Sequence, residues 1–168
     1  MLSELEHYLS RIDDLRAQVR AVIDDLPAEA LNWRPIETSD DHATNSLAVL
    51  AAHVAGAEHF WITEVIGGRP ATRDRDAEFI TVAAGAAGLC QRLDEVAAET
   101  RQVFTELTPV ALDATRGARG RQVDVRWGIL HVIDHTALHL GHMQLTYQLW
   151  MGGRAMASPL WFDRLPKN

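Results

Sequence analysis

The chain has 168 residues, of which 47% are hydrophobic and 23% charged, and its formal net charge is −7. This length predicts one domain, residues 1–168, and the composition is that of a globular protein with a buried core. The negative charge argues against nucleic acid as the main partner, and no apolar stretch is long enough to span a membrane. The acidic N-terminus does not resemble a signal peptide, and the single cysteine fits a reducing compartment, so we expect a cytoplasmic protein.

The first half of the chain contains two predicted helices. The first covers residues 3–26, where a capping box begins at Ser3 and apolar residues recur at helical spacing until Pro27. The second covers residues 46–66 and ends at a pair of glycines. A charged connection over 69–81 follows it.

The second half also contains two predicted helices, over residues 82–107 and 125–151. The connection 109–124 between them is polar, and a turn is expected at 119–120. Strand signals are weak, although 122–126 could pair briefly with another loop. Four long helices without a convincing sheet predict an all-α four-helix bundle, and long crossover connections leave open whether successive helices simply alternate in direction.

Few residues outside the histidines suggest catalysis. The chain lacks the glycine-rich phosphate loops and the serine-nucleophile motif, so nucleotide-binding and serine-hydrolase functions have no support. Cys90 lies among apolar residues of the third predicted helix, and we interpret it as a small buried residue without a nucleophilic role. Glu64, nearly three turns along the helix from His53, could line a pocket, and a surface position near a helix end is the preferred interpretation. Asp134 is expected either to hydrogen-bond a ligand imidazole or to face solvent.

The last predicted helix carries four histidines, His131, His135, His139 and His142, each three or four residues from the next. At about 100° per residue they fall within a stripe roughly 80° wide. Two imidazoles four residues apart can chelate one divalent ion, and a facing helix should supply the third ligand. His53 fits this role, because it is a polar ring in the middle of an apolar helix. On spacing alone, His131 with His135 and His135 with His139 are both acceptable ligand pairs.

The remaining histidines, His7, His42 and His59, are interpreted as residues without a metal. His59 is expected to point away from the face of the helix that carries His53.

Three motifs occur in a fixed order along the chain. They are Asn32-Trp33-Arg34-Pro35, then Ser46-Leu47-Ala48-Val49-Leu50 leading through His53 to Glu58 and Trp61, then His135-x-x-x-His139-x-Gly141. Together they resemble the DinB/YfiT-like superfamily over most of the chain. The resemblance implies a four-helix bundle, often dimeric, and a metal held at positions that match His53, His135 and His139. Many relatives carry glutamine where this chain has His142, so His142 could be an extra ligand, a group behind a ligand, or neither.

Three protein ligands leave a coordination position free for water or substrate, as in catalytic metal sites. Imidazole ligands predict Zn or Ni, with Fe as the alternative. Members of the superfamily include mycothiol-dependent maleylpyruvate isomerase and bacillithiol S-transferases, which implies transfer of a low-molecular-weight thiol to a small electrophilic substrate. Under this hypothesis the candidate catalytic residues are His142 and Arg34.

Two alternatives remain from the sequence. One is a metal-dependent hydrolase that uses bound hydroxide, and the other is a non-catalytic metal-binding dimer with a stress-linked role. We also expect a homodimer, from the resemblance and from an apolar tail that contains Leu160, Trp161 and Phe162.

Overall fold

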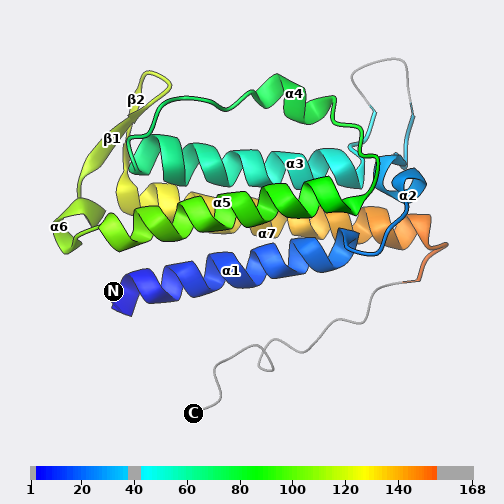
Figure 1. The fold of residues 1–168 in the computed structure, drawn as a ribbon, viewed down its shortest axis with the longest axis horizontal. Helices are drawn as coiled ribbons and strands as arrows, with labels where there is room; N and C mark the ends of the chain where they lie inside the picture. The colour runs from blue at the N-terminus through cyan, green and yellow to red at the C-terminus, as the bar shows by residue number, and fades with distance from the viewer. Residues whose placement is uncertain (1–2, 38–42, 155–168) are drawn as a thin grey trace, which may run out of the picture.

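The computed structural model describes residues 3–37 and 43–154, and its four long helices lie side by side (Figure 1). They are α1 (Ser3–Ile23), α3 (Leu47–Glu58) with its π-helical continuation η1 (His59–Ile66), α5 (Ala86–Glu106) and α7 (Val125–Trp150). The predicted all-α four-helix bundle is confirmed. Its third helix starts four residues later than expected, at Ala86 instead of Val82, directly after Gly85.

The helices do not alternate simply in direction. α1 and α3 each pack against α5 and α7. In Figure 1, α1 and α7 run in one direction and α3 and α5 in the other. The connection 67–85 therefore runs back along the bundle, and it carries the short helix α4 (Arg75–Phe79) over α3.

Short elements close the two ends of the bundle. They are α2 (Ala28–Asn32), α6 (Pro109–Leu112), and the antiparallel strands β1 (Thr115–Ala118) and β2 (Arg121–Asp124). The hairpin turns at Arg119 and Gly120, which have φ values of 48° and 77°. A turn was expected there, but the pairing is more regular than the weak strand signal suggested, because four residues of each strand are in register.

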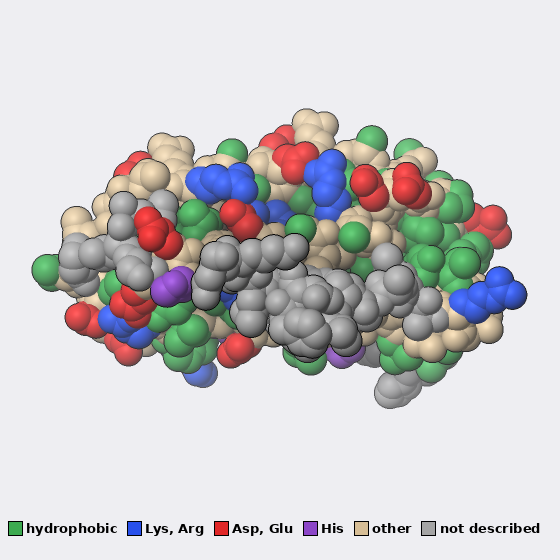
Figure 2. Space-filling view, turned by 90° about the horizontal axis from the view of Figure 1, so that it is seen from below, with side chains coloured by type: hydrophobic (Ala, Val, Ile, Leu, Met, Phe, Trp, Pro, Cys, Tyr) green, Lys and Arg blue, Asp and Glu red, His purple; other side chains and the backbone are tan. Residues whose placement is uncertain are grey.

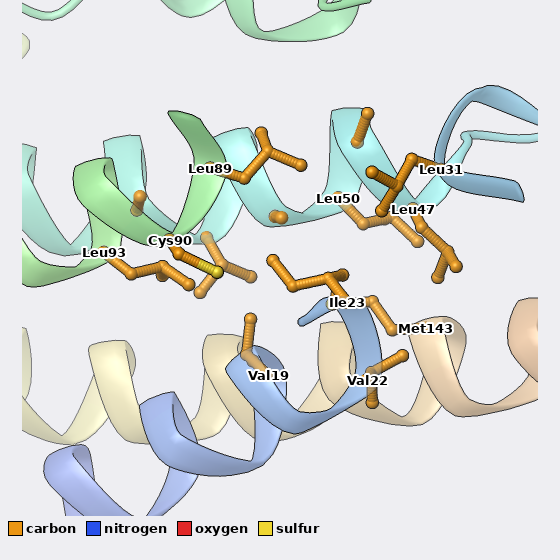
Figure 3. Close-up of a cluster of buried hydrophobic side chains, with 14 of the residues drawn as sticks. Val19, Val22, Ile23, Leu31, Leu47, Leu50, Leu89, Cys90, Leu93 and Met143 are labelled. Carbon is orange, nitrogen blue, oxygen red and sulfur yellow. The ribbon is translucent and has the colours of Figure 1, made fainter. Parts of the chain in front are cut away.

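The core lies where the four helices meet (Figure 3), and each contributes apolar side chains to it. Val19, Leu50, Leu93 and Met143 represent the four helices in this cluster. Burying one such side chain contributes roughly 1.5–3 kcal/mol to the free energy of folding. Nearly all of α3 is buried, so a polar residue in it, such as His53, is surrounded by protein.

The surface seen in Figure 2 carries acidic and basic side chains intermixed, with no continuous basic patch visible on that face. Among the described residues, no helix is both long enough and apolar enough to cross a membrane.

Candidate metal centre

His53, His135 and His139, which we call the His triad, lie together between α3 and α7. Each offers a ring nitrogen, and these three nitrogens lie within 4.8 Å of one another. The Nε2 atoms of His53 and His135 are 3.1 Å apart. The ring centroids of His135 and His139 are 4.4 Å apart, because residues four apart on α7 lie one above the other on the same face.

The other two histidines of α7 are outside this group. The ring of His131 stacks on Trp127, with centroids 4.9 Å apart and an interplanar angle of 5°. His142 is exposed, and its Nδ1 lies 3.4 Å from Nδ1 of His139. Of the two ligand pairs that spacing left open, the structure therefore brings His135 and His139 to His53.

His135 and His139 have pKa values that favour binding of a cation. Burial, together with the nearby rings of His139 and His53, lowers the pKa of His135 to about 3. Burial and the neighbouring His53 lower the pKa of His139 to about 4. Both rings are therefore neutral at pH 7, which is the state that binds a metal. Three imidazoles whose nitrogens converge are a donor set that fits Zn, Ni or Fe.

A carboxylate and a guanidinium lie behind His53. Glu78 of α4 accepts a hydrogen bond from Nδ1 of His53, at 2.8 Å. Arg73 donates to both oxygens of Glu78, from Nε at 2.6 Å and from Nη2 at 2.8 Å. Burial alone would raise the pKa of Glu78, but the hydrogen bonds from Arg73 and His53 outweigh it and lower that pKa below its usual value. Glu78 is therefore a carboxylate at neutral pH.

The π-helical segment η1 carries a buried glutamate, Glu64. A π-helix rotates by a smaller angle per residue than an α-helix, so Glu64 is turned away from the position that an unbroken α-helix would give it. Glu64 is buried, and its Oε1 accepts the backbone N–H groups of Thr72 and Arg73 at 2.6 and 2.7 Å. The expectation that Glu64 is a surface residue was wrong, because the connection 67–85 folds back over η1.

His59 lies in a different polar cluster from the His triad. Its Nδ1 is 2.5 Å from Oε2 of Glu99, and its Nε2 is 2.9 Å from Oγ1 of Thr72. His59 therefore links η1 to α5 and to the connection 67–85 by hydrogen bonds. His42 lies outside the described residues.

The sequence matches a known protein family over most of its length. A family model described as mycothiol S-transferase matches residues 5–150. The chain belongs to this family. No curated protein matches the chain.

Two solved structures share the fold. One is a conserved protein from Enterococcus faecalis, 15% identical, with a TM-score of 0.70 over 90% of this chain and 99% of that one. The other is a DinB-like protein from Bacillus cereus ATCC 10987, 17% identical, with a TM-score of 0.70 over 92% of this chain and 97% of that one. At these identities the likeness shows the fold alone, and with the family match it confirms the resemblance to the DinB/YfiT-like superfamily.

An apolar pocket of about 530 Å³ adjoins the His triad through His142. We call it the apolar pocket, and its other lining residues are Pro35, Ile36, Ala43, Thr44, Asn45, Leu50, Leu145, Thr146 and Leu149. Arg34 is half-buried beside it and donates from Nη1 to the carbonyl oxygen of Thr44, at 3.2 Å. Among the contacts of the described residues, none joins Arg34 to the His triad.

Glu78 and Arg73 are site residues that the sequence did not reveal. They belong to a charged connection without helical or strand periodicity, so nothing in the pattern placed them against α3. One signal was available in Gly56, because an isolated glycine inside an apolar helix indicates a close approach by another group. Asp134, which the sequence predicts either to hydrogen-bond a ligand imidazole or to face solvent, is exposed.

Proposed function

We propose that this protein is a divalent-metal-dependent enzyme that transfers a low-molecular-weight thiol to a small electrophile. The observation that carries the proposal is the His triad, three converging imidazoles, in a chain of the mycothiol S-transferase family. Zn or Ni is the proposed metal, with Fe as the alternative. A cytoplasmic location, where small thiols are kept reduced, is part of the proposal.

The number of ligands favours catalysis over a structural metal. Among the described residues the group able to hold an ion contains three ligands, and neither His131 nor His142 joins it. A structural zinc site is normally closed by four protein ligands, whereas a catalytic site keeps one position free. A divalent ion held there would stabilise the deprotonated form of a thiol that occupies this position.

The protein residues then have separate tasks. The His triad would hold the metal and so determine where the sulfur binds, and His142, exposed beside His139, would accept the proton that the thiol loses. The sulfur electron pair forms a C–S bond to the electrophilic carbon, and the bond to the leaving group breaks with its electron pair. The apolar pocket, lined by Ile36, Leu50 and Leu145, holds the apolar part of the electrophile and keeps water from it. Arg34, beside this pocket, is proposed to bind a polar group of the substrate.

The test combines metal analysis with a thiol-transfer assay. Purified protein should contain about one Zn or Ni per chain, in line with one three-ligand site. It should transfer mycothiol to an electrophilic fluorogenic bimane, and a chelator should abolish the transfer. His135→Ala and His139→Ala should lose the metal and the activity together.

His131→Ala is the matched control, because it removes a histidine of the same helix that stacks on Trp127 outside the His triad. It should retain the metal. Loss of metal in His131→Ala but not in His139→Ala would contradict the ligand assignment. Hydrolysis of an activated ester without thiol, together with no thiol transfer, would favour the hydrolase instead.

A further inference from the structure

The three rings of the His triad differ in what holds their second nitrogen. Nδ1 of His53 faces the carboxylate of Glu78. Within the described residues, the contact of Nδ1 of His139 is with another imidazole, that of His142. Nδ1 of His135 is the one buried side-chain nitrogen or oxygen without a hydrogen-bond partner in the described part of the chain. His53 is thus the member of the His triad whose orientation a carboxylate fixes.

The contact with Glu78 also decides where His53 carries its proton. Nδ1 lies 2.8 Å from Oε2 of Glu78 and 3.5 Å from Nη2 of Arg73. A carboxylate oxygen only accepts hydrogen bonds, so the shorter contact requires a proton on Nδ1. The neutral ring then has its lone pair on Nε2, which is the nitrogen that faces His135.

Gly56 is what allows this carboxylate to reach His53. It follows His53 by three residues and lies on nearly the same face of α3. A Cβ atom built on Gly56 would lie 2.0 Å from Oε1 and 2.6 Å from the carboxyl carbon of Glu78. Contacts this short cannot exist, so any side chain at position 56 would push the carboxylate away.

Arg73 binds Glu78 from the other side, and Glu64 in turn binds the backbone of Arg73. Arg73 donates hydrogen bonds to both carboxylate oxygens of Glu78, and Glu64 accepts a hydrogen bond from the backbone N–H of Arg73. The side chains of Arg73 and Glu78 are 8% and 9% exposed, so their ion pair is shielded from water. A chain of hydrogen bonds therefore runs from η1 through the connection 67–85 to His53.

We propose that Glu78 is a positioning residue that fixes His53 in its Nδ1–H tautomer with Nε2 directed at the metal, and that Gly56 is required because it leaves room for this carboxylate. Carboxylates behind ligand histidines commonly raise metal affinity by about 10- to 100-fold. The part of the proposal that concerns affinity rests on the proposed metal site. The part that concerns the tautomer rests only on the contacts of His53 and Gly56 with Glu78.

The experiment compares the variants Glu78→Gln, Glu78→Ala and Gly56→Ala with wild type. Gly88→Ala is the matched control, because Gly88 is an exposed helical glycine with nothing within 4 Å of an added Cβ. The first readout is the tautomer of His53 in metal-free protein, from long-range ¹H–¹⁵N correlation spectra in which its signals are assigned by their absence in His53→Gln. The second is the Zn²⁺ dissociation constant from competition with a chelating dye. Circular dichroism confirms that each variant is folded.

Wild type and Gly88→Ala should show the Nδ1–H form of His53. Glu78→Ala and Gly56→Ala should show a mixture with the Nε2–H form and bind Zn²⁺ about 10- to 100-fold more weakly. Glu78→Gln should bind with intermediate affinity, because its amide oxygen can still accept the hydrogen bond without the charge. Folded Glu78→Ala with an unchanged tautomer and unchanged Zn²⁺ affinity would overturn the proposal. If wild type shows the expected tautomer but binds no Zn²⁺, the proposed function fails while the positioning role stands.

Discussion

Single side chains in this protein owe their chemistry to burial as much as to their type. His135 and His139 lie in the same helix as the exposed His142, yet burial and neighbouring rings keep the first two neutral far below neutral pH. The same histidine spacing on an exposed helix would be protonated at mildly acidic pH and would release a metal. The facing helix α3 therefore contributes His53 to the His triad and also shields His135 and His139 from water.

Burial also controls the chemistry of Cys90, where it suppresses the reactive form of the side chain. Burial, helped by a hydrogen bond to Asp24, raises the pKa of its thiol, so little thiolate forms at pH 7.5. Since the thiolate is the reactive form, we expect iodoacetamide to modify Cys90 in folded protein at least about tenfold more slowly than a free cysteine. Mass spectrometry over a time course measures this rate.

The control for this prediction is the same reaction in urea, which should restore the rate of an exposed thiol. Cys90→Ala should also keep thiol-transfer activity. Rapid modification of the folded protein with loss of activity would instead indicate that Cys90 takes part in the chemistry.

At the scale of elements, one buried ion pair joins three helices of the bundle. Arg16 of α1 donates two hydrogen bonds to Glu58, at the junction of α3 and η1, and Thr100 of α5 donates to Glu58 at 2.6 Å. Glu58 is 1% exposed. Removing its partner would leave a buried charge without compensation, whereas removing both charges would not.

We therefore expect Arg16→Met to lower the free energy of unfolding by about 3–5 kcal/mol, measured by urea denaturation. Arg20→Met is the matched control, because Arg20 lies on the same helix and pairs with Asp94 at the surface, and it should shift the midpoint much less. The double variant Arg16→Met/Glu58→Leu should recover much of the lost stability. Equal effects of the two single arginine variants would show that burial of the pair is unimportant.

At the scale of the whole molecule, the outer face of α7 is where we expect two copies to associate. Trp127, Leu138, Leu145 and Leu149 lie on one face of this helix and are between 48% and 59% exposed. Leu145 and Leu149 also line the apolar pocket, so this face borders it. The apolar tail that also led us to expect a homodimer, around Leu160, lies outside the described residues. A helix face of this kind favours contact with a second apolar surface.

We expect light scattering at micromolar concentration to give twice the chain mass of 18.7 kDa. Leu138→Glu should shift the mass to that of the monomer, because association would bury the new charge. Gln144→Glu adds the same charge on α7 away from this face and should leave the dimer intact. A wild-type mass equal to one chain would contradict the expectation.

The sequence by itself determined the four helices and the stripe of histidines on the last one, because apolar spacing and the helical repeat are local properties of the chain. It also indicated His53, since a polar ring within an apolar helix needs a partner. Local pattern did not reveal the π-helical turn of η1, the return of 67–85 along the bundle, or the contact of Glu78 with His53. Those depend on which segments meet across the fold, and the connection that carries Glu78 has no periodicity to say which helix it covers. Only the tertiary structure could decide that the chain brings a carboxylate through the space left by Gly56 to the back of one histidine.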